Sequence, residues 1–249
     1  MKVKYFDLKD KKVIISGGAS GIGSSIVEKF CEQDSEVFFL DIDTNKAEEL
    51  IETIKEKKLR IPKFYECDVL DINKLQSIIT KIGNVNILIN NAGNDDRHTI
   101  DDIDEEYLNN RLNLNLKHYF FATQTAKKFM IKNKLGSVIN ISSVSWIRAA
   151  NSFSIYASAK SAIIGLTRSL AKELGQYNIR VNAIMPGSIA TERQSKLWLK
   201  SKLKKEVMNL QCIKRQLMPE DVSYLALYLG SDVSSGCTKQ NFIVDAGLT

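Results

Sequence analysis

The strongest constraint on the fold is an alternation of short apolar runs with longer amphipathic stretches. The short runs are rich in β-branched and aromatic residues, whereas the longer ones repeat apolar residues with the period of a helix. Runs that are apolar almost throughout are typical of parallel strands covered on both faces. We expect strands at 12–17, 36–41, 63–69, 86–93, 136–143, 179–187 and 241–247, and helices at 44–58, 71–82, 104–132, 155–175 and 219–230.

This alternation predicts an α/β fold, a single Rossmann-type, doubly wound parallel sheet of about seven strands with helices on both faces. A chain of 249 residues, 44% of them hydrophobic, can bury one large core, and no repeat or linker divides it. We therefore expect one domain over 1–249. A segment at about 188–212 interrupts the alternation after the sixth strand. Ligands bind at the carboxyl ends of such strands, so this segment is predicted to be a substrate lid.

The composition narrows the class of function. No apolar run approaches the ~18–20 residues of a membrane span, and the basic start lacks the apolar part of a signal peptide, so we expect a cytoplasmic protein without a membrane partner. Two histidines and four separated cysteines disfavour a metal site, and no G-x-S-x-G hydrolase motif occurs. The net charge of +6 comes in short lysine clusters on helix-like segments, which indicates solvated faces and no nucleic-acid partner.

A glycine-rich stretch, "SGGASGIG", joins the first strand to a helix-like segment. Glycine allows a sharp turn and lets a pyrophosphate approach the helix N-terminus. The spacing is G-x-x-x-G-x-G, and a tight strand–helix turn without a ligand is the alternative. With a strand before it and a helix after it, the stretch predicts a dinucleotide site. Its candidate residues are Gly17, Ser20, Gly21, Ile22 and Gly23.

Acidic residues end the second and third strands. Asp41 lies eighteen residues after Gly23, where an acid binds a ribose 2′-hydroxyl and repels the 2′-phosphate of NADP. No basic residue adjoins it, and Ser20 occupies the variable position of the loop, so NAD is the predicted cofactor. Asp68 and Val69 are candidates for contacts with the adenine. Either aspartate could instead be an ordinary turn residue.

Tyr156 and Lys160 lie four residues apart, on one face of a predicted helix, and Ser143 ends the fifth strand. A nearby ammonium favours the phenolate, so the pKa of Tyr156 is expected to fall and the phenol to act as a general base. Ser143 could hold the substrate oxygen. A core tyrosine and a solvated lysine are the alternative for the pair taken alone, but the combination with Ser143 and the glycine loop favours catalysis.

Taken together, several motifs resemble the short-chain dehydrogenase/reductase family over essentially the whole chain. They are "SGGASGIG", "NNAG" at 90–93, Asn115 in "LNLNLKHYFF", Ser143, "YASAK" at 156–160 and "PGSIAT" at 186–191. The resemblance implies that Ser143, Tyr156 and Lys160 are catalytic and that Asn115, rather than the neighbouring Asn113, holds a proton-relaying water. It also implies a cofactor site that includes Asn91, Ala92, Gly93, Tyr156, Lys160, Pro186, Gly187, Ile189 and Thr191.

Within this family, longer stretches resemble aldose 1-dehydrogenases, those for D-xylose in particular: "NNAGNDDRHT", "SSVSW", "TERQSKLW", "QCIKR" and "CTKQNFIVDAG". The implied reaction is oxidation of the anomeric C1 hydroxyl of an aldopyranose to the lactone, with hydride transfer to NAD, in an enzyme that is commonly a homotetramer. A pyranose needs several fixed donors and acceptors. The predicted sugar contacts are Asn94, Ser143, Ser145, Trp146, Asn151, Tyr156 and Gln194.

Three alternatives remain open from the sequence. Trp146 could cover the core instead of stacking on a sugar. The enzyme could be an NAD(P)-dependent reductase of another carbonyl compound, such as a 3-oxoacyl thioester. The chain could also bind a dinucleotide as a regulator without turnover, although the intact Ser143, Tyr156 and Lys160 disfavour this.

Overall fold

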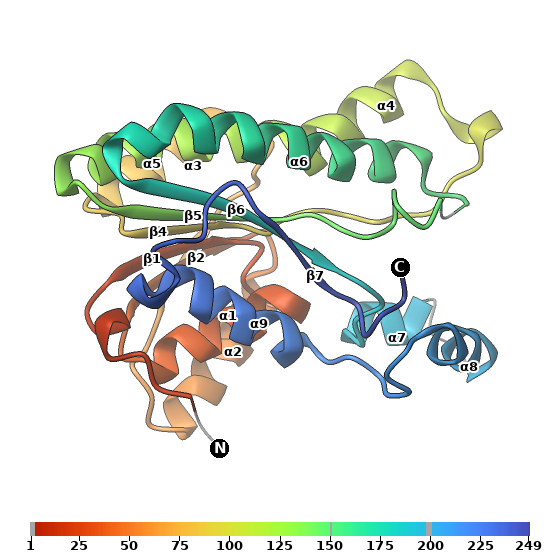
Figure 1. Ribbon diagram of the computed structural model, residues 1–249, viewed down its shortest axis with the longest axis horizontal. Helices are drawn as coiled ribbons and strands as arrows, with labels where there is room; N and C mark the ends of the chain where they lie inside the picture. The colour runs from red at the N-terminus through yellow and green to blue at the C-terminus, as the bar shows by residue number, and fades with distance from the viewer. Residues whose placement is uncertain (1–2, 150, 198–200) are drawn as a thin grey trace.

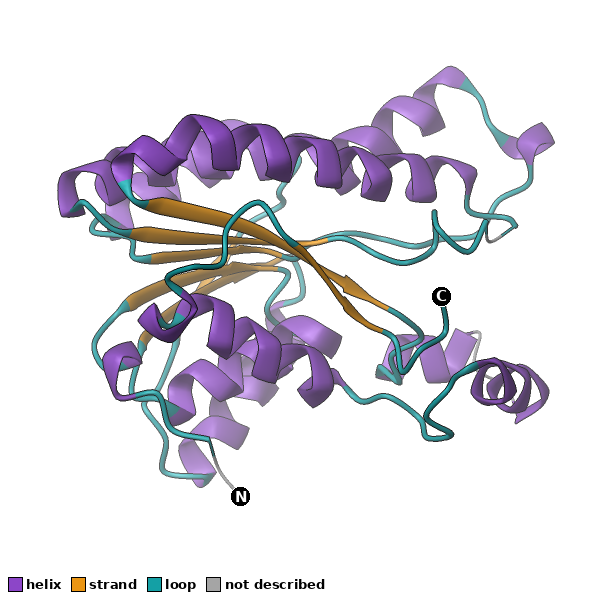
Figure 2. Cartoon of the chain, in the orientation of Figure 1, coloured by secondary structure: helices purple, strands orange, loops and turns teal. Residues whose placement is uncertain are grey.

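The computed structural model describes residues 3–149, 151–197 and 201–249. At its centre lies one parallel sheet of seven strands in the order β3-β2-β1-β4-β5-β6-β7 (Figures 1 and 2). This confirms the predicted doubly wound α/β fold. The strands are β1 Lys12–Ser16, β2 Glu36–Asp41, β3 Lys63–Glu66, β4 Ile87–Asn90, β5 Gly136–Ile141, β6 Ile179–Pro186 and β7 Asn241–Val244.

Helices cover both faces of the sheet, with α3, α5 and α6 on one face and α1, α2 and α9 on the other (Figure 1). None of the helices in the described ranges combines the length and the apolar character needed to cross a membrane. The helices around the sheet are α1 Gly21–Glu32, α2 Thr44–Glu56, α3 Ile72–Ile82, α4 Glu105–Leu112, α5 His118–Asn133, α6 Ser154–Leu174 and α9 Pro219–Gly230.

The strands are apolar almost throughout because both of their faces are buried. Val13, Ile15 and Phe39 pack into the core beneath α1, α2 and α9, whereas Ile14 and Phe38 pack into the core beneath α3, α5 and α6. Successive side chains of a strand point to opposite faces, so each face needs its own set of apolar residues. Burying both sets is what selects the three-layer arrangement from this sequence.

The strand order reverses next to β1. From β1 the chain moves outward through β2 to β3, and then returns to place β4 on the other side of β1. The loops that follow β1 and β4 therefore leave the sheet in opposite directions, which opens a crevice at the carboxyl ends of the strands.

A chain of buried amides joins the middle of the sheet to two helices. The Nδ2 atom of Asn90 in β4 donates to Oδ1 of Asn140 in β5 at 2.9 Å and to Oγ1 of Thr123 in α5 at 3.3 Å. Asn140 in turn donates to Oγ1 of Thr167 in α6 at 2.9 Å. Because an unpaired buried amide is costly, these bonds fix how α5 and α6 sit on the sheet.

The single helix expected over 104–132 is interrupted. Between α4 and α5, residues Asn113–Lys117 form a π-helical turn. The side chain of Asn115 donates to the carbonyl oxygen of Arg111 at 3.0 Å, an acceptor that the backbone N–H of residue 115 would use in a regular α-helix.

The segment at 188–212, expected to be irregular, contains two helices, α7 Glu192–Leu197 and α8 Ser201–Leu210. Positions 198–200 of the predicted lid lie outside the described residues. Both helices lie beyond the carboxyl end of β7, on the same side of the molecule as the C-terminus (Figure 1). The function of this segment as a lid stays a prediction.

Candidate active site

A cavity of about 640 Å³ opens at the carboxyl ends of the strands, and the loops after β1, β2, β3, β4, β5 and β6 line it. The structure thus brings together residues that the sequence scatters over more than 170 positions. Every residue predicted to contact the cofactor lines this cavity: Gly17, Ser20, Gly21, Ile22, Gly23, Asp41, Asp68, Val69, Asn91, Ala92, Gly93, Tyr156, Lys160, Pro186, Gly187, Ile189 and Thr191.

The glycine loop leaves no space for side chains. Gly17 has a φ of +66°, and a Cβ atom there would lie 2.7 Å from Cα of Ala92. A Cβ atom on Gly23 would lie 1.9 Å from the carbonyl oxygen of Gly17. One wall of the cavity is therefore bare backbone at the start of α1, where N–H groups and the helix dipole favour a phosphate. The residues present fit a dinucleotide pyrophosphate.

Asn91 supports this loop. Its Nδ2 atom donates to the carbonyl oxygens of Ser16 at 3.1 Å and Gly17 at 2.8 Å. Its backbone N–H donates to Oγ of Ser16 at 3.1 Å. The residue lies on the cavity wall as expected, but its side chain is used to fix the glycine loop rather than to reach toward the adenosine side.

The two acidic residues at strand ends form turns and also face the cavity. Asp41 accepts hydrogen bonds from the backbone N–H groups of Ala19 at 2.9 Å and Ile42 at 2.8 Å, so it stabilises local turns. Asp68 likewise accepts from the N–H of Leu70 at 2.9 Å. Both also line the cavity. The turn and the ligand interpretations are therefore compatible with each other.

A basic residue lies near Asp41 after all. Lys46, in the first turn of α2, lines the same cavity and forms an ion pair with Glu192 of α7 at 3.7 Å. The sequence showed no lysine or arginine adjacent to Asp41, because the helix brings Lys46 back to the cavity from five residues away. Charges of both signs therefore line this end of the cavity.

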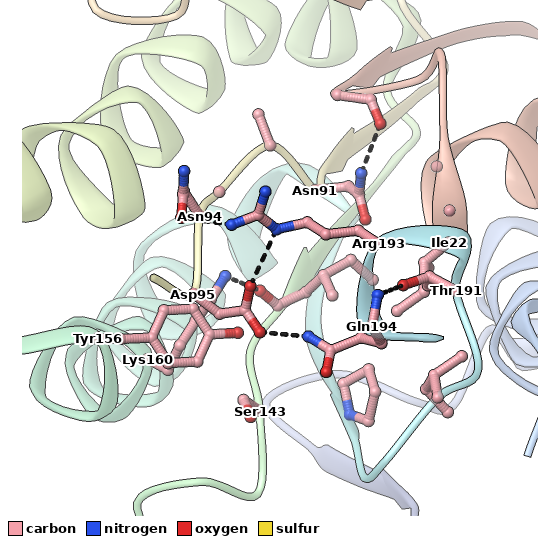
Figure 3. Close-up of a pocket in the computed structure, with 18 of the residues that line it drawn as sticks. Ile22, Asn91, Asn94, Asp95, Ser143, Tyr156, Lys160, Thr191, Arg193 and Gln194 are labelled. Carbon is pink, nitrogen blue, oxygen red and sulfur yellow. Dashed lines mark hydrogen bonds and ion pairs between the residues drawn. The ribbon is translucent and has the colours of Figure 1, made fainter. Parts of the chain in front are cut away.

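The three predicted catalytic residues converge. Tyr156 and Lys160 lie in the first two turns of α6, and Ser143 is the second residue after β5. The Ser143 hydroxyl is near enough to Tyr156 to lower the pKa of the phenol, and Nζ of Lys160 lies 5.6 Å from the centre of the Tyr156 ring (Figure 3). A substrate hydroxyl in the cavity can thus meet the phenol and the serine together.

Lys160 is buried, with 2% of its surface exposed. Its Nζ donates to the carbonyl oxygen of Ile141 at 2.8 Å and to the hydroxyl of Tyr119 at 3.0 Å. Gly93 leaves room for this arrangement, since a Cβ atom there would lie 3.4 Å from Nζ of Lys160 and 2.8 Å from Oδ1 of Asn115.

The charge state of the pair differs from the sequence-based expectation. Burial raises the pKa of Tyr156 above its usual value, and the negative charge of Asp95 adds to this, whereas the nearby Ser143 hydroxyl opposes it. Burial lowers the pKa of Lys160 to about 7. The expected fall in the pKa of Tyr156 is therefore not found, because the low-dielectric surroundings disfavour both charged forms more than the pair favours them.

Asn115 lies behind the cavity wall and is fully buried. Its Oδ1 accepts a hydrogen bond from the backbone N–H of Asn94 at 2.9 Å. With its Nδ2 bonded to Arg111, the amide ties the interrupted helix to the loop after β4. Its expected function in holding a water stays a prediction.

The end of the cavity next to Tyr156 is lined by polar groups from the loop after β4 and from α7 (Figure 3). Asp95, in the loop after β4, accepts hydrogen bonds from Gln194 and, at 3.4 Å, from Arg193 of α7. Arg193 also pairs with Asp96 and lies 3.5 Å from Oδ1 of Asn94. These bonds join the predicted lid to the loop that carries the polar groups.

The residues predicted to contact a sugar are only partly brought together. The Oγ atom of Ser145 is buried and has no hydrogen-bond partner among the described residues. Trp146 is not one of the residues that line the cavity; its side chain is 37% exposed. The loop after β5 turns it outward, so the structure gives no basis for stacking on a sugar. The other predicted contacts line the cavity: Asn94, Ser143, Ser145, Asn151, Tyr156 and Gln194.

Three residues of the site were not expected from the sequence: Lys46, Tyr119 and Arg193. Lys46 lies in α2 and Arg193 in α7, and each helix brings its residue to the cavity wall. Tyr119 gave a signal that could have been used, since it follows Asn115 by four residues and so lies on a nearby face of the helix.

Comparison with known proteins agrees with this geometry. The family model described as enoyl-(acyl carrier protein) reductase matches residues 17–249. The D-xylose 1-dehydrogenase of Caulobacter vibrioides is 39% identical over 243 residues, which cover 98% of this chain and 97% of that protein. The chain belongs to the short-chain dehydrogenase/reductase family. As an oxidoreductase of this family it uses a nicotinamide dinucleotide, NAD or NADP.

Two further members of the family are closely similar. The probable galactose dehydrogenase of Rhizobium meliloti is 38% identical over 249 residues, with 98% of this chain and 97% of that protein covered. The crystal structure of a 3-oxoacyl-[acyl-carrier protein] reductase from Brucella melitensis superimposes with a TM-score of 0.92, at 30% identity, and covers 98% of this chain and 93% of that one.

A buried histidine beside the site predicts how the fold responds to acid. Burial lowers the pKa of His118 to about 3, although its Nε2 lies 3.1 Å from the carbonyl oxygen of Ala92. Between pH 6.5 and 3, His118 is therefore protonated in the unfolded chain but neutral in the folded chain. The free energy of unfolding falls as the pH is lowered, by up to about 1.4 kcal/mol per pH unit from this residue.

We expect His118→Gln, which keeps a donor near Ala92, to reduce this fall. Urea unfolding of both proteins at several values between pH 6.5 and 4.5 measures it. Equal slopes in the two proteins would mean that His118 is protonated in the folded state.

Proposed function

We propose that the protein oxidises the anomeric C1 hydroxyl of an aldopyranose, D-xylose or a similar sugar, to the lactone, with hydride transfer to NAD. The observation that carries the proposal is the polar end of the cavity. Asp95, Gln194 and Ser143 line the cavity together with Tyr156, where a polyhydroxylated ring would find several partners.

The relatives support the same substrate class. Two proteins that match almost the full chain, at 39% and 38% identity, are named for the oxidation of D-xylose and of galactose. Their agreement supports a sugar as the substrate. The polar end of the cavity gives a physical reason why this protein would share that substrate class. Which aldose is preferred depends on single hydroxyl groups of the ring.

Each catalytic side chain has a function in this reaction. Ser143 donates a hydrogen bond to the C1 oxygen and keeps it within reach of Tyr156, which lines the same part of the cavity. Tyr156 accepts the proton of the C1 hydroxyl as the general base. Lys160 holds a positive charge behind the phenol, which favours the phenolate and lowers the cost of removing that proton.

The cofactor residues would hold NAD between the glycine loop and Thr191. NAD bound there would supply the acceptor for the hydride that leaves C1. The bare backbone at Gly17 and Gly23 suits the pyrophosphate, and Asp41 suits the two ribose hydroxyls while repelling a 2′-phosphate. Lys46 would partly offset that repulsion, and its ion pair with Glu192 limits how far it does so.

A reductase of a 3-oxoacyl thioester is the second candidate. The likeness to the reductase from Brucella melitensis favours it. The charged groups Asp95 and Arg193, which line the cavity with Tyr156, disfavour it, because an acyl chain offers them no hydrogen bonds and would leave them desolvated. The homotetrameric state, the cytoplasmic location and the closing of the lid stay predictions.

Initial rates separate these functions. With purified protein we expect kcat/KM for D-xylose, L-arabinose, D-galactose or D-glucose with NAD to exceed that for an acetoacetyl thioester with NADPH by at least about 100-fold. Faster turnover of the thioester would contradict the sugar assignment. Tight NAD binding without turnover of any of these compounds would indicate a dinucleotide-binding regulator instead.

The base is tested by Tyr156→Phe. We expect kcat to fall by about 10³-fold, because the proton acceptor is lost, while the Kd for NAD changes less than about two-fold. Tyr177→Phe, which removes the same atom from a tyrosine that is 40% exposed, serves as the control. Retention of most of the kcat in Tyr156→Phe would exclude this residue as the base.

Cofactor choice is tested by Asp41→Ala. We expect the ratio of kcat/KM for NAD to that for NADP to fall at least about 10-fold, since repulsion of the 2′-phosphate is lost and Lys46 remains. Asp41→Asn removes the charge but keeps an acceptor for the backbone N–H groups of Ala19 and Ile42, so it separates the charge from support of the loop. An unchanged ratio in both variants would contradict the assignment.

A further inference from the structure

Tyr119 is a second tyrosine at the catalytic lysine. It is the second residue of α5, on the side of Lys160 remote from the cavity, and none of its surface is exposed. A hydroxyl group in such a place must be hydrogen-bonded to offset its burial. Its partners therefore indicate why a phenol, rather than a purely apolar ring, occupies this part of the core.

The hydroxyl is part of a closed set of three hydrogen bonds. It accepts from Nζ of Lys160 at 3.0 Å and donates to the carbonyl oxygen of Ile141 at 2.9 Å. That carbonyl oxygen also accepts from Nζ of Lys160 at 2.8 Å. Each member of the triangle thus fixes the other two, and α5, α6 and the end of β5 meet at one point.

We propose that Tyr119 is a positioning residue that holds the Lys160 ammonium in place behind Tyr156 and favours its charged form. The proposal rests on the function proposed for Lys160 above. Without the phenol, one of the two protein acceptors that Nζ has among the described residues is lost, and the flexible lysine side chain gains freedom to leave the position in which it supports the base.

The hydroxyl of Tyr119 does not conduct protons away from the site. Its other neighbours are the carbonyl oxygens of Ile141 and, at 3.5 Å, Ala92, neither of which can pass a proton on. Burial raises the pKa of Tyr119 well above its usual value, so the group stays a neutral phenol. A buried neutral hydroxyl between an ammonium and a carbonyl orients its neighbours and takes no part in proton exchange.

The surroundings of Lys160 make its charge sensitive to a single hydrogen bond. The titratable groups that face it are Tyr156 on its own helix, Tyr119 and His118 from α5, and Asp95 from the loop after β4. Of these, Asp95 is the one whose charge favours the ammonium form of Lys160. Because burial already lowers the pKa of Lys160 to about 7, loss of the Tyr119 hydroxyl should lower it further.

The first test is the pH profile of kcat/KM for Tyr119→Phe. When the ammonium form of Lys160 is less stable, the phenolate of Tyr156 is less stable too. The acidic limb of the oxidation profile should therefore move to higher pH by about half a unit or more, and kcat at pH 7 should fall about five-fold. Tyr107→Phe is the matched control, since the Tyr107 hydroxyl bonds instead to Nδ1 of His98 at 3.2 Å. An acidic limb at the same pH in Tyr119→Phe and the native enzyme would overturn the proposal.

The second test needs no turnover, so it stands even if the proposed reaction is wrong. We expect Tyr119→Phe to lower the melting temperature by about 2–4 °C in the native background and by clearly less in Lys160→Met, where the ammonium is absent. An equal loss in both backgrounds would show that Tyr119 merely supports the Ile141 carbonyl, and would overturn the proposal. If turnover fails and this coupling is present, the proposed function fails while the anchoring of Lys160 stands.

Discussion

The site depends on how a lysine ammonium is buried at the carboxyl end of β5. Lys160 lies out of water, and the Ile141 carbonyl oxygen and the Tyr119 hydroxyl take two of its hydrogen atoms. Taking an ammonium out of water is costly unless its hydrogen bonds are satisfied. The arrangement therefore needs a strand that ends at residue 141, a helix that begins just before Tyr156, and a residue without a side chain at Gly93.

Burial has a second consequence for the chemistry. It disfavours both the phenolate of Tyr156 and the ammonium of Lys160. The pairing of the two groups therefore does not by itself bring them into the charged forms that proton transfer needs. Oxidation should therefore be favoured as the pH rises. The same low-dielectric surroundings strengthen each remaining contact, from the Ser143 hydroxyl to the Asp95 charge that bears on both members of the pair.

Much of the fold and of the site could be predicted from the sequence, because these features follow from residue patterns within single helices and strands. Nearly continuous apolar strands such as 12–17 predict burial on both faces, and the spacing of Tyr156 and Lys160 follows from the helix period. The π-helical turn at Asn113–Lys117 was missed, because periodicity does not report one additional residue in a turn. Residues that act across the fold were also missed: Arg193 meets Asp95 from 98 positions away, and Tyr119 meets Lys160 across two elements.

The most direct test of the account follows the hydride itself. D-Xylose labelled with deuterium at C1 is incubated with the purified enzyme and NAD, and the nicotinamide product is analysed by mass spectrometry and proton NMR. The account predicts one deuterium per turnover on the reduced nicotinamide ring and slower oxidation of the labelled sugar. Reduced cofactor without deuterium would show that the hydrogen comes from another carbon, and would contradict oxidation at C1 by this site.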